Sequence, residues 1–321
     1  MTEPAAVALP VPLDPAKFRD PALTAKGERR ARVSLRALAT LWINTGTLCN
    51  LTCRHCYIES SPTNDRLAYI SAAEVAVYLD EIAREGLATA EIGFTGGEPF
   101  MNPDIIAMLD DALRRGFRVL VLTNAMKPMM KQAAALLDLL ERFGRQLTLR
   151  VSLDHHDATR HERERGPGSF SPSLEGLRWL GAQGFQIAVA GRTLWGESEA
   201  SLRAGFAGLF AAEKIPIDAQ APDALVLFPE MDAGADVPEI TEACWSLLGV
   251  HPDAMMCASS RMVVKRRGAA APAIVACTLL PYDPAFELGT SLRQATSAAV
   301  PLNHPHCAKF CVLGGGSCSA H

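Results

Sequence analysis

The sequence predicts an α/β fold in which a mainly parallel sheet is closed, or nearly closed, into a barrel. Apolar runs of strand length recur between residues 38 and 228, and amphipathic helical patterns separate them. Each strand-to-strand step takes about 30–40 residues, which is the length of a parallel crossover unit. The pattern does not give the strand order, so an open doubly wound sheet remains an alternative from these observations alone.

Capping residues in the sequence predict where the individual helices begin and end. Ser71 and Glu74 form a capping box, which starts a helix that runs to Arg84. Asn102-Pro103-Asp104 is expected to cap the second helix, with Pro103 in its first turn. Three later helices are expected over 128–143, 171–184 and 198–213. The six expected strands cover 39–45, 89–95, 117–124, 147–154, 185–193 and 225–228.

The length and composition fit one large core with a smaller appendage, since the chain has 321 residues of which 49% are hydrophobic. We expect an N-terminal arm over 1–37, a barrel over 38–235 and an extension over 236–321. A helix is expected over 238–248, with Cys244 as a core thiol. The basic run between Lys26 and Arg36 is expected to be the solvated face of a helix.

Charge and targeting signals exclude several classes of function. The net charge is −4 and the pI is about 6.1, so no basic surface indicates nucleic acid binding. The sequence contains no apolar run of about 18 residues that would predict a membrane span, and no signal peptide is apparent. We therefore expect a cytoplasmic protein, in which the nine cysteines are thiolate ligands and not disulfides.

Cys49, Cys53 and Cys56 form a C-x3-C-x2-C motif directly after the first expected strand. Thiolates are the soft ligands that iron–sulfur and zinc sites select. A [4Fe–4S] cluster normally takes four cysteines, so a loop that supplies three leaves one iron open. The triplet alone also fits a zinc knuckle or three buried thiols.

A second motif, Thr95-Gly96-Gly97-Glu98-Pro99, follows the second expected strand. The two glycines would let the backbone approach a ligand closely, whereas a simple glycine turn would not explain the Glu-Pro that follows. Together with the cysteine motif and the adjacent aromatic Tyr57, this stretch resembles the radical S-adenosylmethionine (SAM) superfamily. The resemblance implies a partial (β/α)6 TIM-like barrel, a [4Fe–4S] cluster whose open iron binds SAM, and reductive cleavage of SAM to a 5′-deoxyadenosyl radical.

Polar residues at the carboxyl ends of the strands are expected to face a common cavity. They include Asp154 and Glu197, and the polar segment 155–170 after Asp154 is expected to be a solvated lid, with an acidic-substrate site as the alternative. The resemblance implies that Ser152 contacts the SAM ribose and that Arg192 pairs with the SAM carboxylate; a helix cap or turn is the alternative for such residues. The full set of expected SAM-binding residues is Tyr57, Gly96, Gly97, Glu98, Asn124, Ser152 and Arg192.

The extension contains a second group of cysteines. A hairpin of 262–265 with 273–277 would bring Cys257 and Cys277 together. This arrangement resembles the SPASM and Twitch extensions of radical SAM enzymes, which implies one auxiliary [4Fe–4S] cluster. Zinc is the alternative metal. Two or three of the remaining cysteines are expected to complete the site: Cys307, Cys311 and Cys318.

Three functions are compatible with these features. The first is an enzyme that abstracts a hydrogen atom from a peptide or protein, with flavodoxin or ferredoxin as electron donor. The second is a radical SAM enzyme of cofactor or small-metabolite biosynthesis. The third is a non-catalytic metal-binding or electron-transfer protein. The substrate itself is not predicted by any residue pattern.

Overall fold

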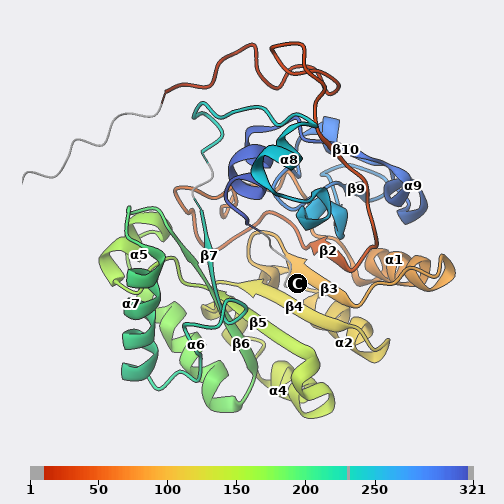
Figure 1. Ribbon diagram of the computed structural model, residues 1–321. Helices are drawn as coiled ribbons and strands as arrows, with labels where there is room; N and C mark the ends of the chain where they lie inside the picture. Colours follow the sequence, from red (N-terminus) through yellow and green to blue (C-terminus); the bar gives the residue numbers. More distant parts are fainter. Residues whose placement is uncertain (1–10, 230–231, 317–321) are drawn as a thin grey trace, which may run out of the picture.

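The computed structural model describes residues 11–229 and 232–316. Its main sheet has eight strands in the order β7-β6-β5-β4-β3-β2-β8-β9; the first seven run parallel to one another, and β9 is antiparallel to β8. Figure 1 shows the curved sheet with helices α1, α2, α4, α6 and α7 along its outside. The predicted partial barrel is confirmed. Its strands are β2 Thr40–Asn44, β3 Glu91–Thr95, β4 Arg118–Thr123, β5 Leu147–Ser152, β6 Gln186–Arg192, β7 Leu225–Phe228, β8 Ser260–Val264 and β9 Ala273–Val275.

The helices agree with the predicted ranges except at their ends. The capping box of Ser71 and Glu74 is formed at the start of α1. Asn102 and Pro103 lie before α2, whose N-cap is Asp104, and the helix expected over 128–143 is interrupted at Lys131 and Gln132. The barrel helices are α1 Ala72–Arg84, α2 Ile105–Arg114, α3 Lys127–Met130, α4 Ala133–Phe143, α5 Ala158–Arg165, α6 Phe170–Gln183 and α7 Glu199–Ala212.

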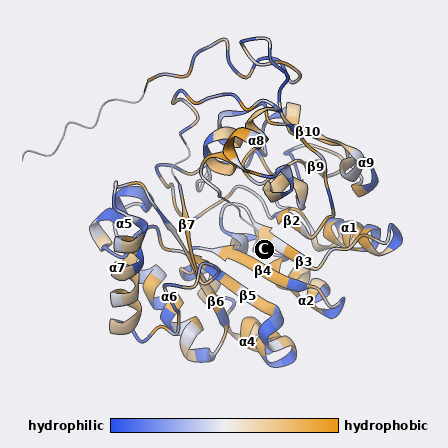
Figure 2. Cartoon of the chain, viewed as in Figure 1, coloured by the Kyte–Doolittle hydropathy of each residue, from blue (hydrophilic) through white to orange (hydrophobic). Residues whose placement is uncertain are grey.

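Two hydrophobic cores lie on opposite faces of the sheet. Leu41 and Ile43 of β2 pack into the core beneath the helices, while Trp42 between them packs into the core formed by the C-terminal segments. This alternation is the two-residue period of a strand. Trp42 lies over Gly93 of β3, where a Cβ would come within 2.4 Å of the indole ring. Figure 2 shows the hydrophobic strands and the hydrophilic outer surfaces of the helices.

The C-terminal segments are joined directly to the barrel sheet. β8 pairs in parallel with β2, and β9 then pairs with β8 as the predicted hairpin. Only α8 Cys244–Leu248 forms within the helix expected over 238–248, because Ile240 and Thr241 pair with the N-terminal arm instead. Cys244 is half-buried at the start of α8. The remaining short elements are β1 Arg32–Val33, α9 Leu292–Ser297 and β10 Val300–Pro301.

The described part of the arm is not the solvated helix that its basic run predicts. It is extended and lies along the C-terminal segments, where β1 pairs with β10 (Figure 1). Arg30 is fully buried and its guanidinium forms an ion pair of 2.5 Å with Glu239. None of the helices in the described ranges is long and apolar enough to cross a bilayer.

Candidate metal and cofactor site

Cys49, Cys53 and Cys56 lie after the carboxyl end of β2 and line one cavity of about 160 Å³. The pKa of Cys49 is raised to about 12, mainly by burial, with smaller contributions in the same direction from the nearby Glu98 carboxylate and the other two thiols. Burial also raises the pKa of Cys53. Three thiols that share one cavity are suited to binding a metal, since thiolate sulfur is a metal ligand and metal binding displaces the thiol protons.

Most of the predicted cofactor-binding residues line the same cavity. They come from the carboxyl ends of four neighbouring strands or from the cysteine loop, as the barrel geometry requires. Glu98 is absent from the lining. The predicted residues that do line it are Tyr57, Gly96, Gly97, Asn124, Ser152 and Arg192.

Gly96 and Gly97 bring the loop after β3 against the segment that precedes Cys49. The Gly97 N–H donates to the Gly46 carbonyl at 2.8 Å, and the Glu98 N–H donates to the Leu48 carbonyl at 3.1 Å. A Cβ on Gly97 would come within 2.2 Å of the Leu48 oxygen. The glycines therefore permit close packing of two loops, and the cysteine loop is held in place by this packing.

Glu98 is 1% exposed and supports the cavity from behind. Its carboxylate accepts hydrogen bonds from the Thr123 hydroxyl and the Asn124 N–H, both at 2.8 Å. Asn124 in turn donates from Nδ2 to Asn50 Oδ1 in the cysteine loop at 2.9 Å. Burial raises the pKa of Glu98 to about 7, although these hydrogen bonds oppose the shift. Glu98 thus positions Asn124 and does not itself face the cavity.

Arg192 ends β6 and has unused hydrogen-bonding capacity at the cavity. Its Nη1 donates to the His55 carbonyl at 3.2 Å, whereas its buried Nε and Nη2 have no partner among the described residues. Buried guanidinium nitrogens are normally paired. Their orientation at the cavity fits an anionic ligand such as a carboxylate.

The segment expected to be a solvated lid contains a helix that the sequence analysis missed. Asp157 is the N-cap of α5, and its carboxylate accepts from the Arg160 N–H at 3.0 Å. The last turn of α5 places Glu164 and Arg165 in the cavity wall. Asp157 was a usable N-cap signal, but the following residues carry no apolar stripe that would have predicted a helix.

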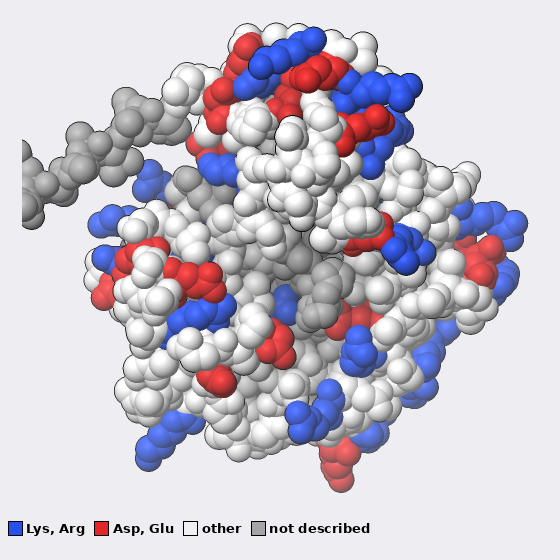
Figure 3. Space-filling model, viewed as in Figure 1, with Lys and Arg blue, Asp and Glu red and all other residues white. Residues whose placement is uncertain are grey.

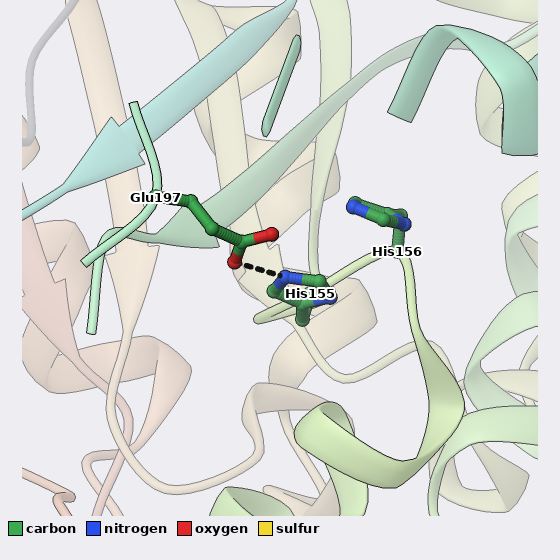
Figure 4. Close-up of side chains that lie close together, drawn as sticks. All are labelled: His155, His156 and Glu197. Atoms are coloured by element: carbon green, nitrogen blue, oxygen red, sulfur yellow. Dashed lines mark hydrogen bonds and ion pairs between the residues drawn. The ribbon is translucent and has the colours of Figure 1, made fainter. Parts of the chain in front are cut away.

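His155, His156 and Glu197 lie together beside the start of α5 (Figure 4). The Asp157 N–H donates to His155 Nδ1 at 2.8 Å, so the ring proton lies on Nε2, which faces Glu197 Oε2 at 2.9 Å. Arg160 pairs with the same carboxylate. His155, Glu197 and Arg160 thus form a hydrogen-bonded and ion-paired network at the start of α5. Glu197, expected to face the cavity, belongs to this network instead.

Cys257 and Cys277 flank the hairpin of β8 and β9, and both lie near Cys307. Burial raises the pKa of Cys307 well above its ordinary value, and the nearby Cys277 and Cys257 thiols raise it further. Cys307 and Cys311 lie on one π-helical segment, Cys307–Val312. Phe310 of this segment stacks on Phe228 and lines the cavity of the first three cysteines. Cys318 lies outside the described residues.

The charged side chains on the face of the molecule in Figure 3 are of both signs. Basic and acidic side chains are interspersed over this face of the described chain (Figure 3).

Comparisons with protein families and with known proteins found relatives of this chain. Residues 43–199 match the family model of the radical SAM superfamily. The antilisterial bacteriocin subtilosin biosynthesis protein AlbA of Bacillus subtilis is 34% identical over 143 residues, which are 44% of this chain and 30% of that protein. The mycofactocin maturase MftC of Mycobacterium ulcerans is 31% identical over 140 residues, which are 44% of this chain and 36% of that protein.

A third relative is named for a different activity. The AdoMet-dependent heme synthase of Oleidesulfovibrio alaskensis is 28% identical over 142 residues, which are 44% of this chain and 34% of that protein. The chain therefore matches about a third of the length of these relatives.

Solved structures agree in fold. Streptococcus suis SuiB bound to S-adenosylmethionine superimposes with a TM-score of 0.57 at 13% identity, over 80% of this chain and 64% of that one. The anSMEcpe structure with bound AdoMet gives a TM-score of 0.55 at 12% identity, over 80% of this chain and 79% of that one. At these identities the likeness concerns the fold alone.

Proposed function

We propose that this chain, whose residues 43–199 match the radical SAM superfamily, is a radical SAM enzyme that abstracts a hydrogen atom from a peptide or protein substrate. In the proposed site Cys49, Cys53 and Cys56 hold a [4Fe–4S] cluster, and SAM occupies the remaining iron. Members of this family use both groups. When bound, the cluster and SAM would supply reductive cleavage of SAM to a 5′-deoxyadenosyl radical.

The main support for this proposal is that one cavity is lined both by three thiols and by an arginine whose guanidinium is only partly hydrogen-bonded. Arg192 offers two buried nitrogen atoms without partners among the described residues, and these fit the SAM carboxylate. Tyr57, Asn124 and Ser152 line the rest of the cavity and would bind the nucleoside part.

The loops around the cavity are positioned by three further residues, which are Glu98, Gly96 and Gly97. Glu98 orients Asn124 through its N–H, and Gly97 is hydrogen-bonded to the segment before Cys49. The Gly96 and Gly97 backbone also lines the cavity, which is compatible with the predicted contact to the SAM ammonium group. Glu98 has a positioning role only.

We also propose one auxiliary cluster in residues 236–321. Cys257, Cys277 and Cys307 are the best-supported ligands, because the Cys277 and Cys257 thiols lie close enough to Cys307 to raise its pKa. Cys311 is the preferred fourth ligand, since it lies on the same π-helical segment as Cys307. Phe310 and Leu279 connect this region to the main cavity, so an auxiliary cluster would lie near the substrate. Zinc is the alternative metal at this position, and metal analysis would distinguish it from an iron–sulfur cluster.

The substrate class rests on the relatives. A bacteriocin biosynthesis protein and a mycofactocin maturase are both similar to this chain, and this favours a peptide or protein. The heme synthases, at slightly lower identity, support small-molecule biosynthesis as the second candidate. A small reduced protein such as flavodoxin or ferredoxin is the proposed electron donor.

The proposal is tested by anaerobic reconstitution followed by iron analysis, electron paramagnetic resonance (EPR) and product detection. We expect about eight irons per chain, falling to about four when Cys49, Cys53 and Cys56 are all replaced by Ala. Adding SAM should change the EPR spectrum of the reduced wild type but not of this variant, and only the wild type should form 5′-deoxyadenosine. Stable zinc with no spectral response to SAM would instead support a non-catalytic metal-binding protein.

Two substrate panels then separate the enzyme candidates. Peptides and tetrapyrroles are added separately, and 5′-deoxyadenosine formation above the uncoupled background is measured for each. Stimulation by tetrapyrroles but not by any peptide would overturn the peptide assignment and leave the radical SAM assignment intact.

A further inference from the structure

The last turn of α5 is attached both to the cysteine loop and to the end of β5. The Arg54 N–H donates to the Glu164 carbonyl at 2.7 Å, and the Glu164 carboxylate contacts His55 Nδ1 at 2.5 Å. The next residue, Arg165, donates from Nη2 to Asp154 Oδ1 at 2.9 Å. Arg165 is thereby held in the wall of the cavity that the three cysteines line.

The Asp154–Arg165 pair is buried, since the two side chains are 4% and 16% exposed. Arg165 Nε is also buried and has no hydrogen-bond partner among the described residues. A guanidinium with a buried unused donor costs stability unless something accepts from it or carries compensating charge. Asp154 therefore orients Arg165 but does not use all of its hydrogen-bonding capacity.

Both members of the pair line the cavity of the three cysteines. The ion pair engages Arg165 Nη2, while the buried Nε in the same cavity wall has no partner among the described residues. Arg165 therefore brings a positive charge and an unused donor to the wall of the three-cysteine cavity.

We infer that Arg165 is a positioning and charge-compensating residue of the three-cysteine site, and that Asp154 sets its orientation. This inference rests on the proposed function, because it requires a cluster bound by Cys49, Cys53 and Cys56. Three thiolates concentrate negative charge, and one-electron reduction of the cluster adds to it. A cation in the cavity wall stabilises the reduced state, in the way that neighbouring charges tune metal centres.

The test is an EPR-monitored redox titration of the reconstituted full chain. The signal of the three-cysteine cluster is identified by its loss in the triple Cys→Ala variant and by its response to SAM. We expect Arg165→Gln to lower the equilibrium constant for one-electron reduction about tenfold, which corresponds to a midpoint lower by about 59 mV. Asp154→Asn should shift the midpoint in the opposite direction, because the guanidinium then keeps its charge without a partner.

Two further variants control for charge and for surface effects. Arg165→Lys keeps the positive charge and should stay closer to the wild-type midpoint than Arg165→Gln. Arg163→Gln removes an exposed arginine from the same helix and should leave the midpoint unchanged. Iron content and circular dichroism are measured for every variant.

The possible failures are distinguishable. If the wild type binds no cluster at Cys49, Cys53 and Cys56, the proposed function fails. If the wild type binds it but Arg165→Gln and Asp154→Asn leave the midpoint unchanged, or shift it in the same direction, the inference is overturned and the proposed function survives. If Arg165→Gln binds no iron, the opposite shift expected for Asp154→Asn decides the question.

Discussion

Glu98 is enclosed by the loop after β3 and by the end of β4, and burial opposes its ionisation. The pKa of this carboxyl is raised from 4.5 to about 7, with burial as the main cause. Phe100, Thr123 and Asn124 each donate a hydrogen bond to it. A carboxyl that must position Asn124 is therefore also a group whose protonation is linked to folding.

The pH dependence of stability follows from the direction of this shift. Between pH 4.5 and 7 the folded protein holds the Glu98 proton and the unfolded chain releases it. The stability contributed by Glu98 is fully present below pH 4.5 and is lost as the pH rises to about 7, by an amount on the order of 3 kcal/mol. Chemical denaturation of the metal-free protein should show this fall, and Glu98→Gln should flatten it.

The comparison of wild type and Glu98→Gln removes the contributions of other titrating groups. The variant is expected to be less stable at acidic pH, because an amide nitrogen replaces one of the accepting oxygens. A wild-type profile parallel to that of the variant between pH 5 and 7 would contradict the prediction.

The residues of the cysteine motif could be predicted because their chemistry is local in the sequence. Cys49, Cys53 and Cys56 are separated by a few residues, and strand periodicity placed Arg192 at the end of its strand. The role of Glu98 could not be predicted, because its partners Thr123 and Asn124 belong to the next strand. Sequence position gives the end of a strand but not which way a carboxylate is turned.

At the scale of the element, the start of α1 shows a local signal that the structure reproduces. The Ser71 hydroxyl accepts from the Glu74 N–H at 3.3 Å, and the Glu74 carboxylate accepts from the Ser71 N–H at 3.0 Å. Glu74 also pairs with Lys265 at 2.5 Å, so the cap of α1 is connected to the segment after β8. The capping box thus joins a barrel helix to the C-terminal segments.

Ser71→Ala should lower the free energy of unfolding by about 1 kcal/mol, because an N-cap hydroxyl is lost and the Glu74 N–H loses its acceptor. Ser201→Ala is a matched control, since Ser201 is an exposed residue within α7. The control should change stability by less than about 0.5 kcal/mol. Urea denaturation measures both; equal effects of the two substitutions would show that the cap does not contribute.

Helix α5 could not be predicted from the hydrophobic pattern of the sequence. Its eight residues are almost entirely charged or polar, so no hydrophobic period marks it. It is held by long-range contacts instead: Glu164 to the cysteine loop and the His155–Glu197 network at its start. Such contacts join residues that are distant in sequence, and they decide both the helix and its place in the site.

At the scale of the whole molecule, the N-terminal arm connects both ends of the described chain. Arg30 and Glu239 form a buried pair in which the side chains are 0% and 6% exposed. Arg30 also donates to the carbonyls of Leu23 and Leu302. The two members of the pair are 209 residues apart, which explains why the basic run around Arg30 was predicted to be solvated.

Arg30→Met should lower the free energy of unfolding by about 3–5 kcal/mol, because Glu239 would remain buried without its cation and the arm carbonyls would lose their donors. The adjacent Arg29 provides the control. It lies 3.9 Å from Glu242, and the two side chains are 82% and 57% exposed, so Arg29→Met should cost less than about 1 kcal/mol. Denaturant titration of both variants checks the difference, and a similar cost for both would mean that the arm does not stabilise the fold.

The part of the protein that Arg30→Met destabilises is as informative as the size of the loss in stability. β1 and β10 pair beside Arg30, and the C-terminal cysteines lie in the core that β10 borders. If the arm stabilises that core, Arg30→Met should expose Cys257 and Cys307 to thiol-specific alkylation faster than it exposes Cys49 in the metal-free protein. Mass spectrometry of the labelled peptides measures the order. Simultaneous labelling of all three cysteines would instead indicate that the barrel and the C-terminal segments unfold as one unit, as expected if the β2–β8 pairing dominates their connection.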